Sequence, residues 1–301
     1  MSVVASEDDI LNIVTTLYHE NEINKLIDLG VDVFLLNTDC LTTRSTQNFS
    51  RNDIRDISTI LHQKNKLMYL NLNSMIHEND LEIVQSYFEF LQSINLDGIV
   101  VFDWTYYPIA KEYGLENKLI FQPGTLTTNL YDPWFYESKS IKGITLAREI
   151  TLDSINVIIQ NKKKIELSIV GHGYQPMFYS RRPLIKNFLL DKTIDEKYLN
   201  RTGFYLEETT RDNYRYPIYE DRFGTHILRE KKLESFNEVN YFRAYINDFF
   251  IERFMLEDEE LYDTLQAYQD LSLVEKYREK YSSQYDSGFY YKQTNLRPEV
   301  K

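Results

Sequence analysis

Residues 143–171 read GITLAREITLDSINVIIQNKKKIELSIVG, and this stretch decides the fold. Its two apolar runs, 143–147 and 165–171, are rich in β-branched residues and have the length of buried strands. Between them, residues 151–160 repeat apolar side chains at helical spacing, and Thr151 stands where a helix begins. The stretch therefore predicts a strand–helix–strand unit with parallel strands.

The same alternation runs along the rest of the chain. Helical patterns cover 50–64 and 81–94, and Ser50 with Asp53 forms a capping box at the start of the first. The other strand-like runs are 10–15, 32–36, 66–72, 98–103, 118–122 and 248–254. Eight such units in about 250 residues are typical of a closed barrel. We predict an α/β fold, a (β/α)8 TIM-like barrel. The alternative is an open doubly wound sheet, but no Gly-x-Gly-x-x-Gly follows the first strand.

A long insertion separates the seventh and eighth predicted strands, at about 174–230. It contains three short runs that indicate antiparallel strands: 207–211, 216–221 and 224–228. We expect a β-rich flap over one end of the barrel. Residues 257–281 predict the last helix, so the sequence favours one barrel domain over 1–281 and a C-terminal tail, 282–301, that shows no usable pattern.

The composition limits the partners of this chain. Its 301 residues are 43% hydrophobic and 27% charged, which is enough to form a core. A net charge of −12 repels polyanions, so unaided binding to nucleic acid is disfavoured unless a local basic patch exists. Cys40 is the only cysteine, and it cannot alone form an intrachain disulfide or hold a structural zinc. Acidic residues near the N-terminus and the lack of a long apolar run predict a cytoplasmic protein without a membrane span.

Polar side chains gather where the predicted strands end, which is where barrels of this type carry their functional groups. These residues are Asn37, Asp39, Asn71, Asn73, Asp103, Gln122, Arg148, Glu149, His172, Glu252 and Arg253. As a group they predict a pocket for an anionic or polyol ligand.

Within this group, Arg148 is the candidate carboxylate-binding residue, and either His172 or Glu149 is the candidate acid–base residue. Asn73, Asp103 and Arg253 are further candidates for substrate binding. The alternative is structural: Arg148 and Glu149 pair with their neighbours, and His172 satisfies a loop carbonyl.

Other chemistry finds less support. No His-Glu-x-x-His, Gly-x-Ser-x-Gly or phosphate-loop motif occurs, so we predict no metal site and no motif-based hydrolase.

The densest basic stretch near the insertion includes Arg181 and Arg182, which we interpret as RNA contacts. The alternative is that both arginines pair with acids such as Asp191, Glu207 or Glu208.

Five stretches carry motifs in a distinctive order: 29–33, 73–82, 147–152, 172–180 and 208–226. The third, AREITL, is similar to A-R-E-L-S-L, and His172-Gly173 followed by Ser180 is similar to H-G-x-x-C-x-x-x-S-G-x-C. Together they resemble the collagenase-like U32 peptidase family, from about Leu11 to Tyr268.

The departures from the family pattern shape what the resemblance implies. Pro176, Pro183 and Glu234 stand where the family has cysteines. Family members that hydroxylate RNA bases or a quinone precursor bind a [4Fe–4S] cluster through such cysteines, so the resemblance implies that this chain holds none. It resembles a short, cluster-free paralogue that accompanies a longer, cysteine-bearing U32 protein.

For that pair the resemblance implies prephenate-dependent hydroxylation of the wobble uridine of tRNA, with prephenate as a co-substrate and tRNA reached through the complex. Two alternatives stay open. The chain is a non-catalytic partner of the longer paralogue, or it is a collagenase-like peptidase, as the family name suggests.

Overall fold

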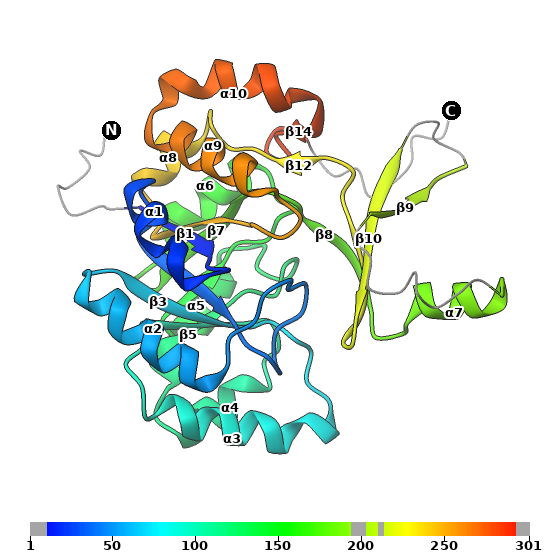
Figure 1. Ribbon diagram of the computed structural model, residues 1–301. Helices are drawn as coiled ribbons and strands as arrows, with labels where there is room; N and C mark the ends of the chain where they lie inside the picture. The colour runs from blue at the N-terminus through cyan, green and yellow to red at the C-terminus, as the bar shows by residue number, and fades with distance from the viewer. Residues whose placement is uncertain (1–10, 194–202, 210–213, 293–301) are drawn as a thin grey trace.

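A closed barrel of eight parallel strands forms the centre of the computed structural model, which describes residues 11–193, 203–209 and 214–292 (Figure 1). In chain order these strands are β1 (Asn12–Thr16), β2 (Val33–Asn37), β3 (Leu67–Leu72), β4 (Gly98–Val101), β5 (Leu119–Phe121), β6 (Gly143–Thr145), β7 (Glu166–His172) and β13 (Asp248–Ile251). β1 pairs with both β2 and β13, which closes the ring. The predicted (β/α)8 barrel is confirmed, although residue 10 of the first expected strand lies outside the described residues.

The core has two layers, one on each face of the barrel wall. The interior is filled by side chains of alternating strand positions: Val14, Val33, Leu35, Tyr69, Val100, Ile120, Val170 and Phe250. A larger cluster fills the space between the strands and the surrounding helices. Because both faces are buried, the strands appear in the sequence as continuous apolar runs rather than alternating ones.

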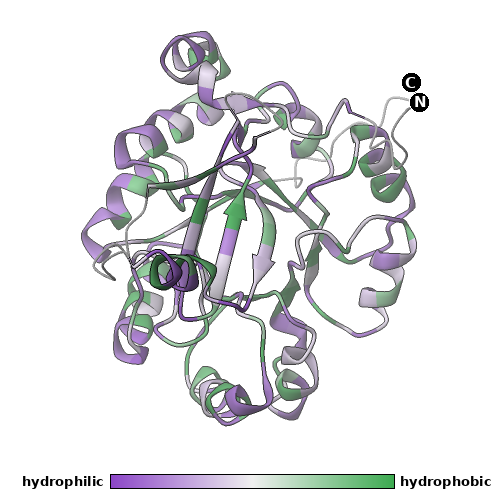
Figure 2. Ribbon diagram, turned by 90° about the vertical axis from the view of Figure 1, so that its right-hand side faces the viewer, coloured by the Kyte–Doolittle hydropathy of each residue, from purple (hydrophilic) through white to green (hydrophobic). Residues whose placement is uncertain are grey.

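Helices cover the outside of the barrel, and Figure 2 shows them arranged around the central strands. They are α1 (Ile23–Asp28), α2 (Arg51–Gln63), α3 (Leu81–Leu91), α4 (Tyr106–Glu112), α5 (Tyr131–Glu137), α6 (Leu152–Asn161) and α8 (Val239–Arg243), with α9 and α10 beyond β13. Ser50 caps α2, since its hydroxyl accepts the Asp53 N–H and Asp53 accepts the Ser50 N–H. No helix in the described ranges is long and apolar enough to cross a bilayer.

The predicted last helix is divided in two. α9 covers Asp258–Gln269 and α10 covers Val274–Tyr281, with a 3-10 turn between them. The break falls at Asp270, whose backbone is extended (φ −129°, ψ 97°) and whose carboxylate accepts the Ser272 N–H at 3.0 Å. An aspartate that caps a new turn competes with helix continuation, and the apolar spacing alone did not reveal it.

The insertion forms an antiparallel sheet beside the barrel (Figure 1). Its strands, in the sheet order β8-β11-β10-β9, are β8 (Pro176–Ser180), β11 (Gly224–Leu228), β10 (Arg215–Asp221) and β9 (Phe204–Glu207). The sequence did not predict β8 or the helix α7 (Leu184–Asp191). It also placed β9 too late in the chain, at 207–211, of which 210–211 lie outside the described residues.

The chain after residue 281 is packed onto the barrel. β14 (Tyr285–Asp286) pairs in parallel with β12 (Lys232–Leu233), and the Tyr290 carbonyl accepts the Leu152 N–H at 3.0 Å. Tyr285 and Tyr290 are both buried. These residues, as far as 292, therefore belong to the outer layer around the barrel.

Candidate functional site

A cavity of about 170 Å³ lies at the C-terminal end of the barrel, between the loops that follow the strands and the flap. β8 and β11 of the flap form one wall, and the loops after β2 to β6 form the other. Its polar lining consists of Thr43, Arg44, Asn73, Gln122, Thr125, Arg148 and His226. The expected pocket at this end of the barrel is present, and Asn73, Gln122 and Arg148 of the predicted ring line it.

Two arginines dominate the charge of the cavity. Arg148 lies three residues beyond the end of β6. Its Nη1 donates to the Pro176 carbonyl at 3.4 Å, and its buried Nε has no partner among the described residues. Arg44 lies in the long loop after β2 with a left-handed backbone (φ 54°), and its N–H donates to Asp221 Oδ2 at 3.0 Å. Such a conformation is unfavourable for a residue with a Cβ. Among the residues that the structure describes, neither guanidinium forms an ion pair.

The electrostatics of the cavity favour an anion. Burial, and then the charge of Arg44, lower the pKa of Arg148 to about 10, and burial lowers the pKa of Arg44 as well. The carboxylate of Glu252 partly offsets the lowering at both arginines. Two guanidinium groups close to each other and without a carboxylate partner are suited to a ligand that carries carboxylate groups.

His226 and Asn73 complete the polar wall. His226 is buried and stacks on Tyr179 with 4.7 Å between ring centroids. Burial, followed by the charge of Arg44, lowers the pKa of His226 to about 2, so its ring is neutral at physiological pH. Asn73 Oδ1 accepts the Thr43 N–H at 2.8 Å, which joins the loops after β2 and β3.

Arg253, a predicted substrate-binding residue, lies outside the cavity and is fully buried. Its Nη1 and Nη2 donate to the two carboxylate oxygens of Glu22 at 2.6 and 2.9 Å, and Nη2 also donates to Asp258 at 2.7 Å. Burial opposes its charge, but these hydrogen bonds raise the pKa of Arg253 overall. Nη1 also donates to the Thr16 carbonyl of β1 at 3.0 Å. The structure thus contradicts the predicted role, because the guanidinium is already occupied by contacts with β1, with the 3-10 turn that contains Glu22, and with α9.

His172 is also separated from the cavity. Its ring lies in the outer layer, with Nδ1 3.2 Å from the Tyr268 hydroxyl and Nε2 3.2 Å from the Tyr285 hydroxyl. Burial, then the charge of Lys232, hold the pKa of His172 well below its ordinary value. A Cβ at the adjacent Gly173 (φ 100°) would lie 2.4 Å from the Glu252 carbonyl oxygen, which explains the glycine of this motif. The proposed acid–base role does not fit this position, and a structural role does.

Glu149 and Asp103 line no part of the cavity either. Glu149 is exposed beside Arg148. Asp103 organises two loops, because Oδ1 accepts the Thr105 N–H at 2.8 Å and Oδ2 accepts the Ile76 N–H at 3.1 Å. Asp103 therefore positions the wall of the pocket rather than its ligand.

The two predicted RNA contacts lie in the flap. Arg181 is 3.7 Å from the carboxylate of Asp80 and donates to the Met75 carbonyl at 3.4 Å. Arg182 is exposed and forms no ion pair with any described residue. The acids considered as alternative partners have other contacts: Glu207 pairs with Arg215, Asp191 pairs with Lys192, and Glu208 accepts a hydrogen bond from the Tyr216 hydroxyl at 3.2 Å.

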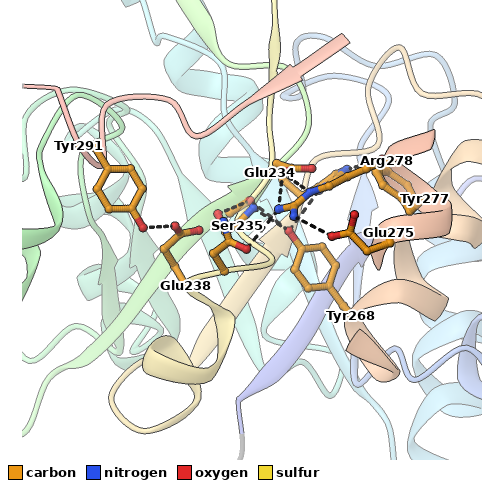
Figure 3. Close-up of polar contacts among 11 residues, drawn as sticks. Glu234, Ser235, Glu238, Tyr268, Glu275, Tyr277, Arg278 and Tyr291 are labelled. Atoms are coloured by element: carbon orange, nitrogen blue, oxygen red, sulfur yellow. Dashed lines mark hydrogen bonds and ion pairs between the residues drawn. The ribbon is translucent and has the colours of Figure 1, made fainter. Parts of the chain in front are cut away.

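The resemblance places Pro176, Pro183 and Glu234 at the cysteine positions of the family, and the structure shows what these residues do in this chain. Pro176 begins β8 and Pro183 precedes α7, and neither can supply a thiolate. Glu234 accepts two hydrogen bonds from Arg278, at 2.7 and 2.9 Å (Figure 3). Burial, and then Asp39, raise the pKa of the Cys40 thiol to about 12. Within the described ranges, no group of three or more His, Cys, Asp or Glu residues could hold a metal ion.

A (β/α)8 barrel with a flap-covered, arginine-lined pocket is the class of protein that these observations define. The chain belongs to peptidase family U32, whose profile matches residues 19–297. It is 28% identical to the tRNA hydroxylation protein P2 of Bacillus subtilis, over 91% of this chain and 95% of that one. It is 32% identical to an uncharacterized protease of Methanocaldococcus jannaschii, over 55% of this chain and 41% of that one. A solved U32 peptidase structure shares the fold, with a TM-score of 0.51 at 12% identity, over 84% of this chain and 96% of that one.

Arg44 and His226 are the most polar of the pocket residues that sequence reasoning missed; Thr43, Thr125 and Tyr179 were missed as well. Arg44 lies several residues beyond the end of β2, so a search confined to strand ends does not reach it. His226 belongs to one of the motif stretches, 208–226, but it arrives at the pocket from the flap. The motif offered a signal for His226, whereas nothing in the sequence marked Arg44.

Proposed function

We propose that this chain acts in prephenate-dependent hydroxylation of the wobble uridine of tRNA, as a cytoplasmic subunit without an iron–sulfur cluster. The observation that carries the proposal is its similarity, across 91% of its length, to a tRNA hydroxylation protein. The product would be 5-hydroxyuridine. We assign this chain the binding of the carboxylated co-substrate.

The pocket supports this assignment chemically. Prephenate carries two carboxylates, and Arg44 with Arg148 provides two guanidinium groups, neither of which forms an ion pair with a described carboxylate. The neutral polar side chains around them, Asn73 and Gln122, can hydrogen-bond to the remaining oxygens of such a ligand.

The direct test is in cells. The gene would be deleted, and the nucleosides of total tRNA measured by mass spectrometry. We expect 5-hydroxyuridine to disappear and to return with the wild-type gene but not with Arg148→Ala. An unchanged level of 5-hydroxyuridine in the deletion strain would reject the function.

A second candidate is a non-catalytic partner of a longer, cysteine-bearing U32 paralogue. The Glu234–Arg278 ion pair at a family cysteine position favours it, since this chain then depends on another protein for any cluster chemistry. Co-purification of the two proteins tests the association, and binding of prephenate by the isolated chain separates the two candidates. Anaerobic reconstitution of this chain alone should yield no stoichiometric iron and sulfide.

The peptidase alternative has less support. The described residues that line the cavity include neither serine nor cysteine, and the sequence contains no protease motif. A fluorescent gelatin assay on the purified chain would show whether peptidase activity exists.

A further inference from the structure

The outward face of α5 is aromatic. Tyr131, Trp134 and Phe135 stand at i, i+3 and i+4 spacing, and their side chains are 68%, 37% and 49% exposed, whereas Pro133 is buried. A helix on the surface of a globular protein normally turns its apolar stripe to the core and its polar face to water. α5 therefore presents to solvent the kind of face that is usually buried.

This apolar face continues onto α6, the next helix along the chain. Trp134 Nε1 donates to the carbonyl of Asn161, the last residue of α6, at 2.9 Å, and the Tyr131 ring lies 5.4 Å from the Trp134 ring. Val157, one turn before Asn161, is 48% exposed. We refer to Tyr131, Trp134, Phe135 and Val157 as the α5–α6 face.

The exposed apolar area of the α5–α6 face approaches what an interface between proteins needs. An aromatic side chain has about 150–250 Å² of surface, so the three exposed rings leave roughly 300 Å² in water. One side of a standard interface has about 800 Å², of which a little more than half is apolar. The face is therefore large enough to form most of the apolar centre of such an interface.

Charges of opposite sign stand on the two sides of Val157. Lys163 and Lys164 follow the C-terminal end of α6, whereas Asp153 lies in its first turn and Glu149 precedes the helix. All four side chains are exposed, and none forms an ion pair with another described residue. The surface around α6 is thus acidic at one end and basic at the other.

We infer that the α5–α6 face binds a second copy of this chain, with the two α6 helices antiparallel about a two-fold axis near Val157. This arrangement places Lys163 of one copy near Asp153 of the other, twice by symmetry, and buries the rings of both copies. RNA or an anionic lipid surface would instead meet the unpaired carboxylates of Asp153 and Glu149. The face lies on the outside of the barrel, and the proposed function does not depend on it.

Sedimentation velocity of the purified full-length chain tests the association. We expect a dimer of twice the 36.0 kDa chain mass at concentrations on the order of micromolar, and it should weaken as salt is added, since the paired charges lie at the rim. Tyr131→Ser should raise the dissociation constant about tenfold or more, because it removes an aromatic side chain from the centre of the interface. Phe188→Ser, at a 56% exposed position of α7, is the matched control and should leave the dimer unchanged.

An exchange of charges tests the antiparallel arrangement. Lys163→Glu and Asp153→Lys each bring like charges together across the two-fold axis, so each should raise the dissociation constant several-fold. A chain that carries both changes has opposite charges facing again and should regain most of the wild-type affinity. A purely structural role of either residue does not predict this recovery. Lys276→Glu, on α10, is the control for the change in net charge and should have little effect.

Three results would each overturn the inference. The first is a wild-type chain that stays monomeric, including the case in which Tyr131→Ser releases the longer U32 paralogue instead of a second copy. The second is a dimer that folded Tyr131→Ser leaves as tight as the wild type, and the third is a folded charge-exchange variant without recovery. The test of the proposed function measures 5-hydroxyuridine in cells, so the two can fail separately.

Discussion

Two arginine sites in this molecule look alike in the sequence and differ in the structure. Arg148 and Arg253 each follow a barrel strand, yet Arg253 is enclosed by Glu22 and Asp258 while Arg148 has no carboxylate partner among the described residues. An arginine that already has its anion stabilises the fold, and one that lacks it is available for a ligand. The comparison teaches that the partners of a charged residue, rather than its place at a strand end, separate structural groups from functional ones.

The largest expected effect is a loss of stability when Arg253, the arginine that already has carboxylate partners, is replaced. Arg253→Met leaves Glu22 buried without its counter-charge, and we expect a loss of about 3–5 kcal/mol in the free energy of unfolding. Urea unfolding followed by circular dichroism measures it. Arg148→Met is the matched control and should change the stability by less than about 1 kcal/mol. Equal losses in the two variants would mean that Arg148 is structural too.

The order of the two arginines should reverse for ligand binding, where the Arg148 variant should have the larger effect. Arg148→Ala removes charge-assisted hydrogen bonds, each of which contributes about 1.5–3 kcal/mol, so prephenate affinity should fall about tenfold or more. Calorimetry with the purified chain measures this, and a normal thermal unfolding curve would show that the fold is intact. Unchanged affinity in the folded variant would remove Arg148 from the site.

The two buried histidines, His172 in the outer layer and His226 at the cavity, should make the stability of the protein depend on pH. Burial lowers the pKa of His172 and of His226, so below about 6.5 the unfolded chain binds more protons than the folded one. Stability should therefore be lost as the pH falls from about 6.5 to 5, by up to about 1.4 kcal/mol per pH unit for each histidine.

The variant His172→Phe measures how much His172, in the outer layer, contributes to the pH dependence of stability. The pH dependence of its unfolding free energy between pH 5 and 7 should be weaker than that of the wild type by about the share of one histidine. Carboxyl groups titrate in both proteins, so the difference between the two curves is the quantity to compare. Parallel curves would contradict a neutral, buried His172.

The fold was largely predictable because strands that are buried on both faces appear in the sequence as continuous apolar runs. All eight barrel strands were located by continuous apolar runs, and the start of α2 by the Ser50 capping box. The strand β8 was missed because its residues are partly exposed and follow no clear alternation. The division between α9 and α10 was missed because apolar spacing continues across the break at Asp270.

The pocket was less predictable, since it depends on contacts between distant segments. The position of Arg148 after β6 was enough to place it correctly at the cavity. His172 follows the same rule but points into a cluster of tyrosines from α9, α10 and β14. Whether a side chain meets a tyrosine hydroxyl or an open cavity is set by residues about 100 positions away, and no local pattern reports it.

The smallest effect concerns the flap arginines. Arg182 has no ion pair among the described residues, whereas Arg181 already contacts Asp80 and the Met75 carbonyl. If tRNA phosphates lie on this surface in the complex, each lost contact should lower the slope of log affinity against log salt by about one. We expect Arg182→Glu to approach that change and Arg181→Glu to cause less, because Arg181 would first have to leave its protein partners.

Lys111→Glu, on α4, is the control for the change in total charge. tRNA binding would be measured for the reconstituted pair of U32 proteins across a salt series. If all three variants show the slope of the wild type, the paralogue alone holds the RNA, and neither Arg181 nor Arg182 contacts it.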